Sequence, residues 1–326
     1  MSDPKRHHYV PKFYLGYFTE AGFNGTEVLW IYDKESSEPR AQTPVNTCVE
    51  SGFYSFETAT GKDVEIEKGL SQIESETKRV LDRLQDPKAL LTTEDISTLS
   101  AFLALMYVRV PRSKQSVSEI IAAAAAQFAK GRAKDRDGIA RYFRETKDRD
   151  HKLTEEELIK LLSEFDQHFT IEVDSKAALL HSLTGFPKVA EIFLGMNWCL
   201  CLAPASKHFL TSDSPVCVFF RPAPGQAGFG AGLMHSNAEV TFPISPRVIL
   251  LLSWRRKQKR ASVSTGFVHE MNRRMAWSAE RFVISPLCSR LTTELVREAS
   301  ATRNLPKMDP ERLKQYMERQ WEKWKQ

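Results

Sequence analysis

The hydrophobic pattern changes its period along the chain, and this change limits the folds that the sequence can adopt. Between residues 64 and 183, apolar side chains recur every three to four residues, as on an amphipathic helix. After Asn197 they form short continuous runs separated by Pro, Gly, Ser and Asn, which are typical of strands covered on both faces. The pattern therefore predicts an α+β fold. In it, a helical middle layer packs with a mixed or antiparallel sheet, built mainly from the C-terminal half plus short N-terminal strands.

Local sequence features predict where individual elements begin and end. A helix is expected over 64–84, and Thr92 with Asp95 forms a capping box that opens a second helix. Thr154 and Glu157 form another capping box and open a further helix. The remaining helices are expected at 117–130, 139–143, 175–183, 268–279 and 292–299, with Pro187 breaking the helix before it. Strands are expected at 28–32, 52–56, 198–202, 208–211, 216–220, 239–242, 248–252 and 281–285.

These elements predict one main domain. We expect a single α+β domain over residues 1–290, with a helical insertion at about 114–195, and a C-terminal helical extension over 291–326. The tail begins with Asp309 as an N-cap and Pro310 at the first helical position. One face of this tail helix would carry Leu313, Met317, Trp321 and Trp324.

Composition excludes several classes of protein. With 42% hydrophobic and 27% charged residues over 326 positions, the chain is neither disordered nor collagen-like. No apolar run approaches the roughly 18 residues of a membrane span, and Met1–His8 lacks the apolar stretch of a secretory signal. We therefore expect a cytoplasmic protein with no membrane partner. Its five cysteines are expected to be reduced core thiols, although Cys199 and Cys201 would share one face of a strand and could hold a metal.

The most unusual string is Arg6–Leu15, which reads RHHYVPKFYL. In an extended segment the adjacent His7 and His8 point to opposite sides, so at most one of them faces a given site. One interpretation makes these histidines metal ligands or general bases. The other is an N-terminal arm whose aromatic side chains dock in the core, with a histidine that is merely hydrogen-bonded.

Blocks spread along the chain resemble the bacterial domain of unknown function 4238. They are HHYVPKFYL at 7–15, the acidic helix segment 66–74, VRVP at 108–111, FLTSDSPV at 209–216 and FPISP at 242–246. Asn272, followed by a strand within 279–285, is similar too. The resemblance spans roughly 7–286 and implies that these blocks belong to one fold, while the family name carries no activity. The chain departs from the pattern at Gly16 and Tyr17, where Arg and Asn are expected, and at Ser214, where Asn is common.

Three carboxylates are candidate ligands for a divalent cation, Mg²⁺ or Mn²⁺. On the helix over 64–84, Glu67 and Glu74 fall about 20° apart, two turns along, at one border of the apolar stripe. Asp213 lies in Thr-Ser-Asp-Ser-Pro between two strands, where loops on a rigid sheet often carry chemistry. The alternative is structural: salt bridges that frame the helix, and an Asx turn at Asp213.

Basic residues are candidates for anion contacts. Arg109, near the end of its helix, could clamp an anion or complement the helix dipole. From residue 255 onward, seventeen bases face eight acids, whereas residues 50–100 hold eleven acids and six bases. Five of the bases follow Trp254 in one loop that could neutralise phosphates or simply be solvated: Arg255, Arg256, Lys257, Lys259 and Arg260.

Two hypotheses follow. The chain has no Walker A, GxGxxG, GxSxG, HExxH or CxxC motif, which argues against P-loop, Rossmann and serine-hydrolase chemistry. The first hypothesis is a metal-dependent phosphodiesterase or nuclease, a bacterial effector or defence component. In it Glu67, Glu74 and Asp213 hold the metal, and the basic loop binds nucleic acid. His7, His8 and Arg109 would be its catalytic residues. The second is a non-catalytic scaffold that binds nucleic acid or protein and contains a structural His/acid network.

Overall fold

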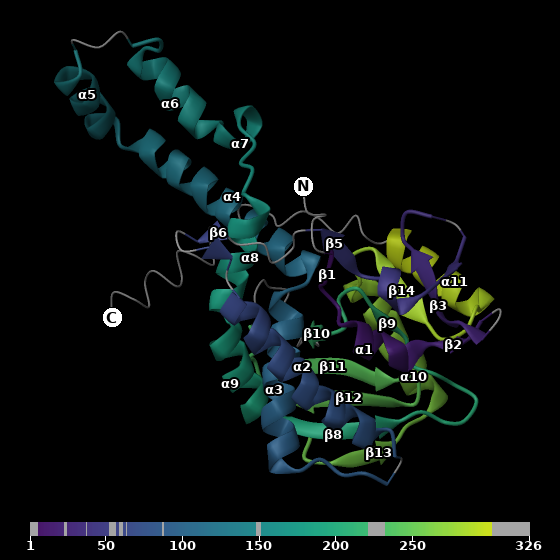
Figure 1. Cartoon of the computed structure of the whole chain (residues 1–326). Coiled ribbons are helices and arrows are strands. Elements are labelled where there is room, and N and C mark those ends of the chain that lie inside the picture. The colour runs from purple at the N-terminus through teal and green to yellow at the C-terminus, as the bar shows by residue number, and fades with distance from the viewer. Residues whose placement is uncertain are drawn as a thin grey trace. The chain divides into compact units, whose positions relative to one another are not determined.

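The computed structural model describes residues 6–22, 25–36, 38–51, 57–58, 61–62, 64–86, 88–147, 151–220 and 232–301 (Figure 1). Side chains are described for these residues except 6, 57–58, 61–62, 64–68 and 175–176. The predicted strand 52–56 and the predicted tail helix from Asp309 lie outside the described residues. The described residues form two compact units: one holds those up to Ser113 and from Leu179 onward, and the other holds Lys114–Ala178.

A five-stranded sheet forms one part of the first unit. Its strand order is β10-β11-β12-β8-β13, and every pair is antiparallel except β13 with β8. The central strand β12 is buried at every position, as its continuous apolar run predicts. The strands are β8 (Asn197–Leu202), β10 (Cys217–Phe220), β11 (Ala238–Ser245), β12 (Val248–Ser253) and β13 (Arg260–Ser262).

A second sheet combines strands from the N-terminal and C-terminal parts of the first unit. Its order is β2-β3-β14-β9, and β4 also pairs with β3. The strands are β2 (Glu20–Ala21), β3 (Glu27–Asp33), β4 (Arg40–Gln42), β9 (Thr211–Ser212) and β14 (Phe282–Ser285). Two short antiparallel pairs, β1 (Arg6–His8) with β5 (Val49–Ser51) and β6 (Glu57–Thr58) with β7 (Gly61–Lys62), complete the described strands. Short N-terminal strands thus pair with a C-terminal strand, and the α+β fold is confirmed.

The helices of the first unit mostly follow the sequence prediction. They are α1 (Lys12–Leu15), α2 (Val64–Leu84), α3 (Thr93–Val108), α9 (Phe186–Gly195), α10 (Thr265–Ser278) and α11 (Arg290–Ala301), with 3₁₀ turns at η1 (Gly16–Phe18) and η3 (Pro44–Asn46). The capping box of α3 is confirmed: Thr92 Oγ1 accepts the Asp95 N–H, and the Asp95 carboxylate accepts the Thr92 N–H. The predicted helix break at Pro187 is confirmed, because α8 (Ser175–Thr184) ends just before it. The sequence did not predict α9, in whose first turn Pro187 lies and where its missing N–H costs no hydrogen bond.

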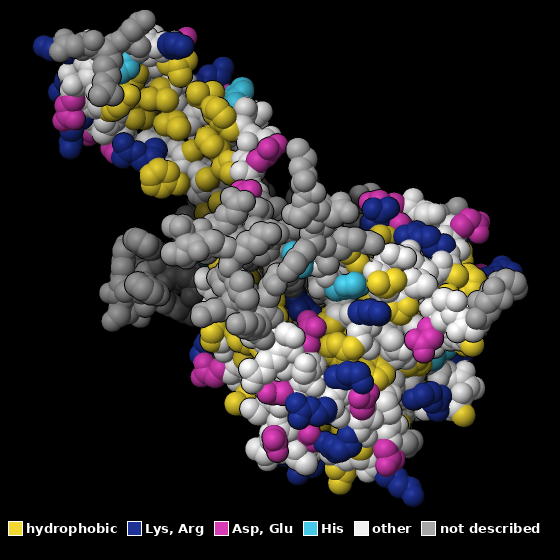
Figure 2. Space-filling model, viewed as in Figure 1, with side chains coloured by type: hydrophobic (Ala, Val, Ile, Leu, Met, Phe, Trp, Pro, Cys, Tyr) yellow, Lys and Arg dark blue, Asp and Glu magenta, His cyan; other side chains and the backbone are white. Residues whose placement is uncertain are grey.

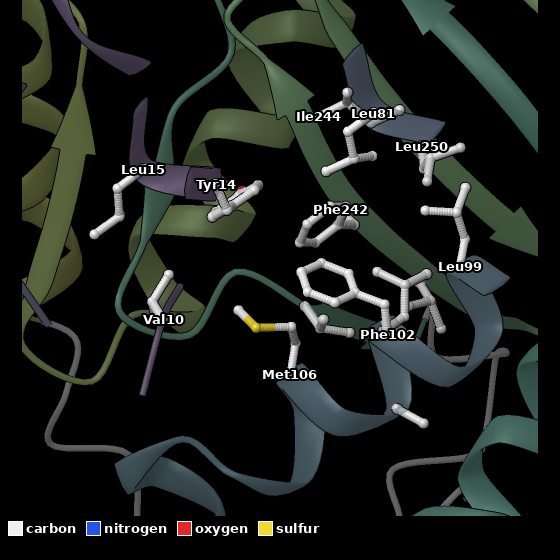
Figure 3. Close-up of a cluster of buried hydrophobic side chains, with 14 of the residues drawn as sticks. Val10, Tyr14, Leu15, Leu81, Leu99, Phe102, Met106, Phe242, Ile244 and Leu250 are labelled. Carbon is white, nitrogen blue, oxygen red and sulfur yellow. The ribbon is translucent and has the colours of Figure 1, made fainter. Parts of the chain in front are cut away.

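The core of the first unit includes the N-terminal arm. Figure 3 shows Tyr14 of α1 beside Phe242 of β11, and the two rings stack with their centroids 4.9 Å apart. Phe102 of α3 meets the same Phe242 ring edge-on at 5.9 Å. The arm is therefore part of the hydrophobic core, which explains its density of aromatic residues.

The second unit is helical. It contains most of α4 (Pro111–Lys134), then α5 (Arg136–Glu145), α6 (Glu155–Ser163) and α7 (Phe165–His168), and it ends in the first turn of α8 (Ser175–Thr184). The capping box of Thr154 with Glu157 opens α6 as predicted. The unit ends at Ala178, whereas the predicted insertion extends to about 195; α9 packs against α3 in the first unit instead. In the first unit, α11 contributes Leu295 and Val296 to a core cluster shared with α10.

Two further findings concern cysteines and membranes. All five cysteines are free thiols, and four of them are buried, as expected; the exposed one is Cys288. Among the described helices, none combines the length and apolar character needed to cross a bilayer.

Candidate functional site

The N-terminal arm is held by main-chain pairing with β5. His7 lies opposite Glu50 and His8 opposite Val49 in this antiparallel ladder, and both histidines are half-buried. His8 Nε2 donates to the carbonyl oxygen of Pro44 over 3.3 Å. Because neighbours in a strand face opposite sides, the two histidines contact different surroundings, as the sequence predicts.

Tyr9 is the residue of this arm whose pKa responds to Asp213. Its N–H donates to the carbonyl oxygen of Cys48 (3.0 Å), and its ring is buried. Burial, together with the nearby Cys48 and Asp213, raises the pKa of the Tyr9 hydroxyl. The Asp213 carboxylate therefore lies close enough to the arm to act on it electrostatically.

Asp213 itself is buried and bound by backbone amides. Its Oδ1 accepts the N–H of Glu280 (2.8 Å), and its Oδ2 accepts those of Arg281 (2.6 Å) and Phe282 (2.8 Å). Its own N–H donates to the carbonyl oxygen of Phe282. Burial raises the pKa of Asp213 to about 6, against the opposing effect of the three amides. The carboxylate thus fixes the turn between α10 and β14 onto the end of β9.

Arg109 and Glu74 form an ion pair between α3 and α2. Arg109 is the C-cap residue of α3, and its side chain is 1% exposed. Its Nη1 donates to Glu74 Oε1 over 2.9 Å, and Glu74 is 30% exposed. Sequence reasoning identified both residues but did not pair them. Glu67 lies two turns earlier in α2, and its side chain is outside the described part of the chain.

The described donors do not form a metal site. Among the described residues, neither Glu74 nor Asp213 hydrogen-bonds His7 or His8, and no group of three or more His, Cys, Asp or Glu side chains is placed to hold a metal ion. Cys199 and Cys201 lie on one face of β8 with their sulfurs 3.8 Å apart, as their spacing predicts. In the structure, backbone amides bind both carboxylate oxygens of Asp213, and the Arg109 guanidinium binds Oε1 of Glu74. The predicted set with Glu67 remains a prediction.

A second polar cluster, which the sequence did not reveal, surrounds Asp33. Arg281 donates to Asp33 through Nη2 (3.0 Å) and Nε (3.1 Å), and Arg40 approaches it at 3.4 Å. Burial of Asp33 is outweighed by the hydrogen bond from Arg281 and its charge, so the pKa of Asp33 is lowered. A pocket of about 280 Å³ opens beside it, between the turn after β3 and α11. Because Arg281 also gives its backbone N–H to Asp213, the two clusters share one residue.

The basic loop between β12 and β13 is largely exposed. Residues 255–259 are exposed, and Arg256 is 51% exposed with Glu239 at 3.8 Å. Arg255 donates to Ser236 Oγ (3.3 Å), whereas Arg260 is half-buried and donates to the carbonyl oxygen of Ala89 (2.8 Å). Four of the five predicted phosphate contacts therefore present their charges to solvent, and Arg260 has a structural contact.

Comparison with known proteins places the chain in a family. Residues 6–286 match the model of a family described as Protein of unknown function (DUF4238). The chain belongs to this family. The match agrees with the resemblance of the blocks from the N-terminal arm to β14 and confirms it. No curated protein and no solved structure matches the chain.

The family blocks meet at Tyr14, which gives a first prediction. Its hydroxyl is buried between Thr211 Oγ1 (2.7 Å) and the carbonyl oxygen of Pro243 (2.8 Å), to which it donates. Tyr14→Phe should lower the free energy of unfolding by about 1–2 kcal/mol, because it leaves a buried carbonyl without this donor. Urea unfolding measures the loss. The control is Tyr107→Phe, whose hydroxyl makes no hydrogen bond to any described residue, and an equal loss there would contradict the assignment.

Proposed function

We propose that this protein is a non-catalytic, cytoplasmic nucleic-acid-binding protein that contacts phosphates through its basic loop. One observation carries the proposal: Arg255, Arg256, Lys257 and Lys259 are four exposed cations within five residues, in the loop between β12 and β13. Because the loop is anchored by two strands of a rigid sheet, it loses little conformational entropy when it binds a ligand. Electrostatic contacts of this kind bind the phosphate backbone without reading its sequence.

The contacts of the candidate site support a scaffold rather than a reaction centre. Asp213 holds a turn, Glu74 neutralises a buried arginine, and His8 binds a backbone carbonyl. Each of these contacts stabilises the fold: His8 helps to hold the arm, Glu74 links α2 to α3, and Asp213 fixes the turn before β14. The metal-dependent nuclease hypothesis requires Glu74 and Asp213 to exchange these partners for a cation, so it is the weaker candidate.

The test is the salt dependence of binding. Replacing Arg255, Arg256, Lys257 and Lys259 by Gln should weaken binding to labelled single-stranded DNA or RNA and reduce the slope of log K against log salt by up to about 3. Arg260 is kept because of its contact with Ala89. The control removes four exposed charges from the helical unit, at Arg141, Arg144, Lys152 and Lys160. An unchanged slope in the loop variant, or an equal change in the control, overturns the proposal.

A cleavage assay separates the two hypotheses. The purified chain is incubated with Mg²⁺ or Mn²⁺ and with labelled DNA and RNA, and the products are resolved on a denaturing gel. The scaffold proposal expects intact nucleic acid. Cleavage that disappears in Glu67→Gln, while binding persists, would establish the nuclease instead.

A further inference from the structure

Helix α4 exposes an apolar stripe. Ile120 is 60% exposed and Phe128 is 73% exposed, and the exposed Ala124 lies midway between them. Residues spaced by four share one helix face, and Ile121, 37% exposed, borders it. Figure 2 shows apolar side chains gathered along the helical unit. A stripe of this size on a helix normally packs against a partner.

The chain contains a segment with a matching pattern. Residues 302–326 lie outside the described part, and their sequence carries Leu313, Met317, Trp321 and Trp324 at spacings of four, four and three. These spacings place the four side chains within about 80° of one helix face. The two tryptophans are two of the six in the whole chain, and both would be exposed on a tail that packed against nothing.

We propose that the C-terminal segment 309–325 forms a helix that packs antiparallel on the exposed stripe of α4 in the same chain. The two stripes have the same four-residue spacing. In one register, Leu313 meets Phe128, Met317 meets Ala124 and Trp321 meets Ile120. The small side chain at the centre leaves room for the larger methionine and lets the helices approach closely.

Charge selects the antiparallel direction. In that register, Asp309 lies opposite Arg132, one turn beyond Phe128 on the same face of α4. Arg132 is 48% exposed and also pairs with Asp135 over 3.0 Å, so Asp309 would be its second carboxylate partner. The parallel arrangement with the same stripes would bring Lys325 against Arg132, two like charges. Seventeen helical residues extend about 25 Å, which spans α4 from residue 116 to residue 132.

Cross-linking tests the register directly. Ala124→Cys and Met317→Cys are combined in a Cys288→Ser background, because Cys288 is the exposed native thiol among the described residues. A short bismaleimide should link the pair within one chain and give a monomer of altered mobility on a denaturing gel. The control moves the tail cysteine to Gln315, about 160° around the predicted helix. Equal linking in the control, no linking, or linking only between two chains overturns the proposal.

Tryptophan emission gives an independent readout. Ile120→Glu places a charge on the stripe, so it should displace the tail and shift the emission to longer wavelength while far-UV circular dichroism stays near wild type. In a Trp321→Phe, Trp324→Phe background the same change should produce no shift. The matched control is Gln115→Glu, exposed and on the opposite face of α4. A shift that survives without the two tail tryptophans, or none in the full chain, overturns the proposal.

Discussion

Asp213→Ala should lower the free energy of unfolding by about 3–6 kcal/mol. The carboxylate accepts three backbone N–H groups, from Glu280, Arg281 and Phe282, and is 1% exposed. Alanine leaves all three donors inside the protein without an acceptor, at about 1–3 kcal/mol each, and water can compensate part of this loss. Chemical denaturation at neutral pH measures the change.

The neighbouring Ser214 provides the control. Its hydroxyl is buried and has no hydrogen-bond partner among the described residues. Ser214→Ala should therefore change the free energy of unfolding by less than about 0.5 kcal/mol or raise it slightly. If Ser214→Ala costs as much as Asp213→Ala, the loss reflects packing at this turn rather than the three amides.

The same carboxylate predicts a pH dependence. Burial raises the pKa of Asp213 from its ordinary value of 3.8 to about 6. A raised pKa means that the folded state binds the proton more tightly, so the stability contribution is fully present below pH 3.8 and is lost as pH rises through 6. The wild type should therefore gain stability relative to Asp213→Asn as pH falls from 7 to 4, by up to about 3 kcal/mol. A difference that is flat over this range, or that falls, contradicts a raised pKa.

Local features of the fold were predictable from the sequence, and distant pairings were not. The bounds of α2 and the capping box at Thr92 depend on residues within one helical turn, so the sequence pattern contains them. Pro187 marks both the end of α8, which the sequence predicted, and the first turn of α9, which it did not. The packing of α9 against α3 stabilises this further helix, and that contact is absent from the local pattern.

The partners of the candidate site residues were also not predictable from the sequence. Asp213 was identified as a polar residue at a strand end, but its partners are backbone amides, which every residue except proline possesses. No side-chain pattern could therefore indicate them. The sequence shows that Arg109 and Glu74 carry opposite charges, but it does not show that they pair. That pairing depends on the packing of α3 against α2.

Breaking the ion pair between Arg109 and Glu74 is the other change for which we expect a large loss of stability. Arg109→Ala should cost about 3–5 kcal/mol, because it removes a large buried side chain and a charge-assisted hydrogen bond. Glu74→Leu alone should cost about 2 kcal/mol, at the lower end for a broken buried pair, since Glu74 is 30% exposed and water screens the remaining charge. Urea unfolding of both single variants measures these losses.

A double-mutant cycle isolates the interaction between the two charges. Arg109→Met keeps apolar volume at the buried position, and combining it with Glu74→Leu removes both charges together. Because the double variant leaves neither charge uncompensated, its loss should be smaller than the sum of the two single losses by at least about 1 kcal/mol. The control cycle uses the surface pair Lys188 and Glu191, 64% and 68% exposed, where the coupling should stay below about 0.5 kcal/mol. Additive losses at Arg109 and Glu74 would mean that the guanidinium is held by its other surroundings and that Glu74 only borders them.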